Sequence, residues 1–381
     1  MKNACCANHV YHMFMVDMTN RQPPLFGLSG ENSIGFLRLI LAYLVLVGHS
    51  FSYGGFGEDP LLSLSRDQVA IGRFPVDVFF AFSGYLISQS WDKSSSAQEF
   101  LWHRFLRIYP AFLVCIAFTG IFVAKYFTGS VDISYLLNNF PLIFGTDQSI
   151  DGLFAGNPGG SLVNGSLWTL PWELRAYCLL LIFGIFGGLR SHKISIFSFV
   201  ACWAIFVAQI IIHNEVGDKT VITSWYRLMT FFFAGMVIFS SRGKIRFRAR
   251  TAWVSLFILI FSSWMSPTVW LNSGGLFYVL APVLLTYFSF WLATTGVFKQ
   301  INQRYDYSYG VYIYGSVVLQ CLASLHLNDN YWTYLGLASL VTAVLSSLSW
   351  YVIEKPALNL KHLVGCSRRG SSKPQVDIEC K

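Results

Sequence analysis

Long apolar stretches separated by short polar segments run through most of the sequence. A helix that crosses a bilayer needs about 20 mostly apolar residues. Ten stretches are candidates, of which the seventh is short, at residues 34–53, 71–90, 108–128, 174–190, 194–213, 221–240, 252–266, 274–295, 307–326 and 331–353. The pattern therefore predicts an all-α fold, a polytopic transmembrane helical bundle with about ten spans.

The composition agrees with a membrane protein. Only 12% of the 381 residues are charged and 54% are hydrophobic, whereas soluble domains carry roughly 25% charged residues. The net charge is +8, but the basic residues fall in short segments between apolar stretches. The positive-inside rule explains that distribution better than binding to nucleic acid does. We expect the lipid bilayer, and no nucleic acid, as a partner.

The Lys and Arg residues also predict an orientation. With the N-terminus inside, the segments placed in the cytoplasm are basic, whereas residues 129–170 contain no Lys or Arg. This bias predicts a multi-pass protein of the cell inner membrane with both termini in the cytoplasm. We expect a cytoplasmic tail at 1–30, a membrane domain at 31–358 and a disordered cytoplasmic tail at 359–381. Residues 129–170 should form an external loop, partly re-entrant.

The first predicted span holds two ionisable residues, Arg38 and His49. Ionisable groups inside a span are functional candidates because burying them in lipid is costly. An imidazole can take the proton of an alcohol that attacks a thioester, so His49 is a candidate catalytic residue, as a base or as a covalent carrier of the acyl group. Arg38, near the inner face, could meet the phosphates of coenzyme A. A histidine bonded to a neighbouring helix and a snorkelling arginine remain the alternatives.

The second span begins with Arg73 and Asp77, which share a helix face at a spacing of four. Asp77 is a candidate catalytic residue that could orient a histidine or pair with an arginine. Arg73 is a candidate for substrate binding. The alternative is a neutralising pair that makes insertion less costly. Ser83 and Gly84 interrupt an aromatic stretch and should permit close approach of another helix.

A basic segment, FLWHRFLRIYP, stands between the second and third predicted spans. Arg104 and Arg107 lie three apart, on one face, in a loop that we place in the cytoplasm. Arginine binds phosphate through paired donors, so both residues are candidates for binding coenzyme A. The alternative is an ordinary positive-inside flank.

The segment NGSLWTLPWELRAY precedes the fourth span. Glu173 is placed at the membrane edge beside Trp168 and Trp172. Indole faces can stack on a sugar while the carboxylate accepts its hydroxyl protons, and Glu173 could also act as an acid or a base. An aromatic belt with a capping Glu is the alternative.

Two further segments carry polar groups near the C-terminal end. Tyr309 opens the ninth span, where it could line a pocket with Tyr312, and is a candidate for substrate binding. Glu354 and Lys355 fall at the cytoplasmic end of the tenth span and suggest a structural ion pair. The eight cysteines show no metal-ligand spacing, so we expect no metal site.

Taken in order, these segments resemble acyltransferase family 3, the integral membrane O-acyltransferases that modify bacterial polysaccharides, lipopolysaccharides and nodulation factors. The segments are LRLILAYLVLVGH, VDVFFAFSGYLI, FLWHRFLRIYP, GSLWTLPWE, YSYGVYIY and YVIEKP. The resemblance covers roughly residues 32–358 and implies acyl-CoA, commonly acetyl-CoA, as a co-substrate, with no permanently bound cofactor. Many relatives have a histidine where this chain has Gly315, so any role of that histidine is absent here or supplied elsewhere.

The resemblance implies transfer of an acyl group, with acetyl expected, to a hydroxyl of a surface or secreted carbohydrate or glycolipid. The carbohydrate classes are exopolysaccharide, O-antigen and lipo-oligosaccharide, and polysaccharide-assembly proteins are potential partners. Two other hypotheses stay open: a transporter or exporter of a lipid-linked sugar, and a non-catalytic scaffold. An exporter would move its substrate without consuming acyl-CoA, and a scaffold would tolerate joint replacement of His49 and Glu173.

Overall fold

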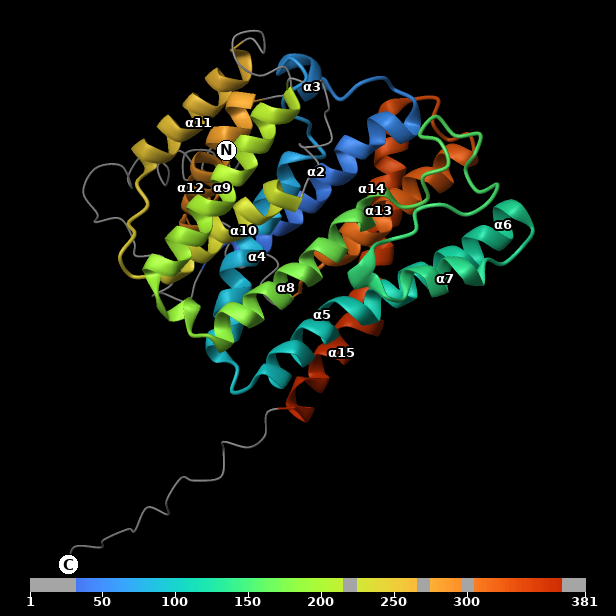
Figure 1. Cartoon of the computed structure of the whole chain (residues 1–381). Coiled ribbons are helices and arrows are strands. Elements are labelled where there is room, and N and C mark those ends of the chain that lie inside the picture. The colour runs from blue at the N-terminus through green and yellow to red at the C-terminus, as the bar shows by residue number, and fades with distance from the viewer. Residues whose placement is uncertain (1–31, 215–224, 266–274, 296–304, 365–381) are drawn as a thin grey trace, which may run out of the picture. The chain divides into compact units, whose positions relative to one another are not determined.

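The computed structural model describes residues 32–214, 225–265, 275–295 and 305–364, and these residues contain helices and no strands. The all-α prediction is therefore confirmed for the described part of the chain. The helices are α2 (Ile34–Gly54), α3 (Pro60–Leu64), α4 (Phe74–Lys93), α5 (Ala97–Ala117), α6 (Ala124–Thr128), α7 (Ile133–Asn139), α8 (Leu170–Ile185), α9 (His192–Asn214), α10 (Trp225–Ser240), α11 (Ala249–Trp264), α12 (Gly275–Thr294), α13 (Ser308–Ser324), α14 (Tyr331–Ser349) and α15 (Lys355–Asn359) (Figure 1). Short 3-10 helices lie at Leu142–Phe144 (η2), Gly165–Thr169 (η3), Gly188–Arg190 (η4) and Leu360–Leu363 (η8), and π-helical turns at Phe118–Val123 (η1) and Trp350–Glu354 (η7).

Five helices among the described residues are long and apolar enough to cross a membrane. They are Ile34–Gly54, Ala97–Thr128, His192–Ile212, Gly275–Thr294 and Tyr331–Leu363, and the shorter helices α10 and α11 are also apolar. This finding agrees with a multi-pass membrane protein. The helix α8 has 16 residues, or about 24 Å of rise, which is less than the roughly 30 Å of a hydrocarbon core. The count of about ten spans stays a prediction.

Three predicted boundaries change. Residues 91–107, between the second and third predicted spans, were expected to form a loop, but α5 begins at Ala97 and carries Arg104 and Arg107 on helical turns. The prediction was wrong because a polar helical face resembles a loop in a search for apolar stretches. Residues 129–170 contain α7 and two 3-10 helices instead of a simple loop. Helical structure also continues to Leu363, past the expected start of the tail, and residues 1–31 and 365–381 lie outside the described residues.

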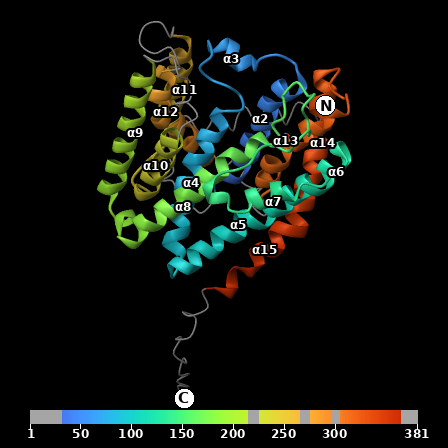
Figure 2. The same ribbon diagram turned by 45° about the vertical axis from the view of Figure 1, so that its right-hand side comes forward.

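The chain forms two compact units. The first comprises Met1–Leu86 and Gly187–Ser308, and the second comprises Ile87–Phe186 and Tyr309–Lys381. In the first unit α9, α10 and α12 pack on one another and α11 packs on α12. In the second unit α5 contacts α7, α8 and α15, and α14 continues into η7 (Figure 2).

Glycines bring α4 and α10 into close contact in the first unit. A Cβ atom at Gly84 would lie 1.9 Å from the carbonyl oxygen of Phe232, and one at Gly235 would lie 1.9 Å from that of Ala81. Only residues without a side chain permit this reciprocal approach, in which dispersion contacts between backbones hold the two helices together. The prediction that Gly84 permits close helix packing is confirmed.

A line of polar residues at a spacing of four runs along α13 in the second unit. Tyr312 bonds Thr169 at 2.6 Å and Ser316 bonds Ser166 at 2.7 Å. Gln320 donates to the carbonyl oxygens of Gly160 and Leu162, and Ser324 donates to Asn157. These bonds hold residues 157–169 against α13 and so fix the start of α8, where Glu173 lies.

Candidate functional site

The candidate base His49 lies on the last turns of α2 in the first unit. Its ring stacks on that of Tyr53 with centroids 5.4 Å apart and planes 19° from parallel. The imidazole is partly buried, and no described residue hydrogen-bonds to it through a side chain or a backbone group. The ring nitrogens are therefore not hydrogen-bonded by the described part of the protein.

A contact between two glycines fixes the backbone beside His49. A Cβ atom at Gly48 would lie 2.3 Å from the amide nitrogen of Gly72, so α2 and the segment that leads into α4 touch through their backbones. The same segment is held by Asp59, which caps α3 and accepts a bond from the amide of Ile71 at 2.5 Å. This packing brings the histidine into the neighbourhood of the chain that carries Arg73.

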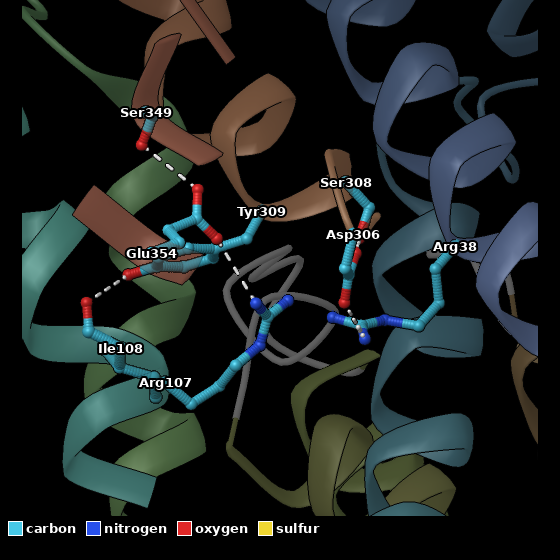
Figure 3. Close-up of polar contacts among 8 residues, drawn as sticks. All are labelled: Arg38, Arg107, Ile108, Asp306, Ser308, Tyr309, Ser349 and Glu354. Atoms are coloured by element: carbon cyan, nitrogen blue, oxygen red, sulfur yellow. Dashed lines mark hydrogen bonds and ion pairs between the residues drawn. The ribbon is translucent and has the colours of Figure 1, made fainter. Parts of the chain in front are cut away.

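Arg38, eleven residues before His49 on the same helix, forms an ion pair. Its Nη1 atom lies 2.9 Å from Oδ2 of Asp306, and its guanidinium lies 5.9 Å from the ring centre of Phe79. Asp306 also accepts a hydrogen bond from Ser308 (Figure 3). About a fifth of each side chain of the ion pair is exposed, 22% for Arg38 and 23% for Asp306. A partly exposed arginine held at one nitrogen can still present other N–H groups to a phosphate.

Asp77 forms a fully buried ion pair with Arg227. The Nη1 atom of this arginine lies 3.2 Å and 3.3 Å from the two carboxylate oxygens, and both side chains have 0% exposure. Arg227 also lies over the ring of Tyr278, 5.6 Å from its centre. The sequence analysis offered Arg73 as the neutralising partner of Asp77, but the ion pair forms with Arg227 on α10, and Arg73 contributes only a longer-range attraction. This geometry joins α4 to α10 and indicates a structural role for the carboxylate.

In the second unit, Tyr177 connects two predicted site residues. Its hydroxyl donates a short hydrogen bond to Glu173, one turn earlier on α8. Arg104 of α5 lies over the same ring at 6.0 Å and interacts with both the tyrosine and the glutamate. Sequence reasoning placed Glu173 and Arg104 at opposite edges of the membrane. The structure gathers both residues around one tyrosine, and their sides of the membrane stay a prediction.

Arg107, one turn further along α5, belongs to a second cluster in this unit. Its Nη1 atom lies 3.2 Å from Oε2 of Glu354, and its guanidinium lies 5.4 Å from the ring centre of Tyr309 (Figure 3). The hydroxyl of Tyr309 donates to the carbonyl oxygen of Ile108 at 2.9 Å. The expected pairing of Glu354 with Lys355 is wrong, because adjacent residues on a helix point in different directions and Glu354 faces α5.

The two candidate tryptophans differ in their surroundings. Trp172 carries the guanidinium of Arg175 at 4.2 Å from its ring centre. Arg175 also donates to the carbonyl oxygens of Ile143 and Phe144, so it joins the first turns of α8 to η2. Trp168 is half-buried on η3. The guanidinium of Arg175 therefore covers one face of the Trp172 ring.

The segment between α7 and η3 carries a carboxylate that stays ionised in mild acid. Partial burial acts to raise the pKa of Asp147, but hydrogen bonds from Asn138 and Ser149 outweigh it and hold the pKa below its ordinary value. Asp147 also has its backbone carbonyl bonded by Asn139. These bonds fold the segment on itself, and the carbonyl oxygen of Gln148 accepts a bond from the amide of Val163 at 2.8 Å.

Sequence reasoning missed three members of these clusters, Arg227, Asp306 and Tyr177, and it did not find the partner of Glu354. Arg227 could have been found, because it is an ionisable residue inside a predicted span. The others have signals too common to single out. No group of three or more His, Cys, Asp or Glu residues is placed to hold a metal ion in the part of the chain that the structure describes.

Residues 31–351 match the family described as the acyltransferase domain. The chain belongs to this family, which confirms the resemblance inferred from its motifs. Two curated relatives are similar over nearly their whole length. An O-acetyl transferase of Shigella phage Sf6 is 28% identical over 341 residues, 85% of this chain and 95% of the relative. Nodulation protein 10 of Rhizobium leguminosarum bv. viciae is 26% identical over 352 residues, 87% of this chain and 94% of the relative. No solved structure matches the chain.

Proposed function

We propose that this protein transfers an acyl group, acetyl in the first instance, from acyl-CoA to a hydroxyl of a surface or secreted carbohydrate or glycolipid. Membership of the acyltransferase family and similarity to a phage O-acetyl transferase support the reaction class. Five helices suited to crossing a bilayer support its membrane setting. In this proposal the protein lies in the inner membrane with both termini in the cytoplasm, where acyl-CoA is found.

The single observation that carries the chemistry is the unengaged imidazole of His49. In the proposed reaction the ring takes the proton of the acceptor hydroxyl as its oxygen attacks the thioester carbonyl. The new C–O bond forms, the C–S bond breaks, and the proton passes from the ring to the departing coenzyme A thiolate. The ring of Tyr53 restricts the imidazole to one orientation.

The arginines are proposed to bind the donor. Arg38, Arg104 and Arg107 each interact with a carboxylate or with a tyrosine bonded to one. Such interactions hold a long, charged side chain in place, where it can attract the phosphates of the donor. Glu173, with the rings of Trp168 and Trp172, is proposed to hold the sugar. A carboxylate beside stacking faces accepts hydroxyl protons and can favour one acceptor hydroxyl over others.

The test is reconstitution of the purified protein in lipid vesicles with acyl-CoA labelled in its acyl group. We expect release of free coenzyme A together with label in a carbohydrate fraction isolated from the source cells. His49→Ala should abolish both signals. Ser52→Ala is the matched control, because Ser52 lies on the same helix, is exposed and bonds only its own backbone turn. Transport of the carbohydrate without consumption of acyl-CoA would instead support an exporter.

A further inference from the structure

Arg107 is held from three sides within the second unit. Its backbone belongs to α5. Its Nη1 atom lies 3.2 Å from Oε2 of Glu354 in η7, and its guanidinium carbon lies 5.4 Å from the ring centre of Tyr309 in α13. The hydroxyl of Tyr309 is itself fixed on the carbonyl oxygen of Ile108, the next residue along α5 (Figure 3). The guanidinium is therefore placed by side chains from two other segments.

A π-helical turn orients the carboxylate of Glu354. The turn covers Trp350–Glu354 and follows α14 without a break. Pro356 comes two residues later, in the first turn of α15, and has no amide hydrogen to donate to the preceding turn, so one helical hydrogen bond is missing there. A π-helical turn contains one residue more than an α-helical turn, which rotates the residues after it by about 100° around the axis. Such turns are frequent at functional sites.

The carboxylate of Glu354 is buried and is paired at both oxygens. The side chain of Glu354 is 2% exposed and that of Arg107 is 15% exposed. Ser349, the last residue of α14, donates to the other carboxylate oxygen at 3.0 Å. The neighbouring cation Lys355 turns away and lies 5.8 Å from the ring centre of Tyr351. Burial of a carboxylate is costly without such pairing. Termination of a helix alone does not account for a buried carboxylate with two partners.

We propose that Glu354 is a positioning residue that fixes the guanidinium of Arg107 to receive a phosphate of the acyl-CoA donor. This inference rests on the proposed function, which assigns Arg107 to donor binding. An unrestrained arginine loses rotamer freedom when it binds a ligand, whereas one held in advance does not. Glu354 therefore acts through Arg107 on donor affinity, and it does not touch the reacting atoms.

The test compares initial rates of Glu354→Ala, Glu354→Gln and Glu354→Asp with wild type at varied acyl-CoA and at varied acceptor. Glu354→Ala should raise the KM for acyl-CoA on the order of tenfold, the value of one hydrogen bond to a charged group. The KM for the acceptor and kcat should change little. Glu354→Gln keeps an acceptor oxygen and should restore most of the donor affinity. Glu354→Asp withdraws the carboxylate and should raise the KM for acyl-CoA even if the alanine variant does not accumulate.

A double variant separates positioning from general support of the fold. Arg107→Ala/Glu354→Ala should have the same KM for acyl-CoA as Arg107→Ala alone, because the effect of Glu354 passes through the arginine. Lys355→Ala, an exposed neighbour, should match wild type. An unchanged KM for acyl-CoA in Glu354→Asp or in Glu354→Ala, with Arg107→Ala still raising it, would overturn the positioning role alone. An unchanged KM in Arg107→Ala would instead overturn the proposed donor role of the arginine.

Discussion

Replacement of Asp77 by Asn distinguishes a structural carboxylate from a catalytic one. In the structure Asp77 and Arg227 are both fully buried, and Nη1 of the arginine lies 3.2 Å and 3.3 Å from the two carboxylate oxygens. The asparagine has nearly the same shape but no charge. The substitution therefore leaves a buried guanidinium without its counter-ion and disturbs little of the packing.

Removing one partner of a buried ion pair costs about 3–5 kcal/mol. The ring of Tyr278, 5.6 Å from the guanidinium, continues to attract the cation, so we expect a value near the lower end, about 3 kcal/mol. This loss corresponds to a decrease of about a hundredfold in the ratio of folded to unfolded protein. The catalytic rate of each molecule that remains folded should be close to that of wild type.

The assay is equilibrium unfolding by denaturant in detergent micelles, with turnover expressed per folded molecule. The double variant Asp77→Asn/Arg227→Met leaves no unpaired charge and should recover most of the lost free energy of unfolding. Wild-type stability of Asp77→Asn combined with loss of turnover would refute this reasoning and make Asp77 a catalytic residue.

Three further predictions concern the packing and the first-unit ion pair. Gly84→Ala should destabilise the protein by at least about 1–3 kcal/mol in the same unfolding assay, because its Cβ would overlap a carbonyl of α10. Gly336→Ala, on α14 with nothing within 4 Å, should be neutral or stabilising by up to about 1 kcal/mol; a loss at both glycines would contradict the packing argument. Gln320→Ala should cost about 1–3 kcal/mol, since two backbone carbonyls lose their donor, and limited proteolysis should then cut residues 157–169 faster. Asp306→Asn should change stability by less than about 1 kcal/mol because the pair is partly exposed, while the KM for acyl-CoA should rise as Arg38 loses its anchor; an unchanged KM would remove Arg38 from the donor site.

The helices were largely predictable from the sequence because each predicted span is an apolar stretch long enough to become a helix in lipid. The start of α5 was not, because its first turns carry His103, Arg104 and Arg107 on a polar face that resembles a loop. The family was predictable because several short motifs occur in a fixed order. That order depends on the sequence alone and requires no knowledge of contacts.

The partners of the charged residues could not be predicted. Asp306 lies 268 positions from Arg38 and Glu354 lies 247 positions from Arg107, so only the packing of helices brings them together. Within one helix the spacing rule could have found one missed contact, since Glu173 and Tyr177 are four apart and bond. The π-helical turn that ends at Glu354 contains one extra residue. The Glu354 side chain therefore points in a direction that a regular α-helical projection does not predict.

The central claim is that His49 enables transfer of an acyl group to a carbohydrate hydroxyl. Mass spectrometry of surface glycans tests it most directly, in cells that lack the protein and in cells that produce wild type, His49→Ala or Ser52→Ala at equal membrane levels. The account predicts acylated glycan with wild type and with Ser52→Ala, and none with His49→Ala or without the protein. Equal acylation of glycans by His49→Ala and wild type would contradict it.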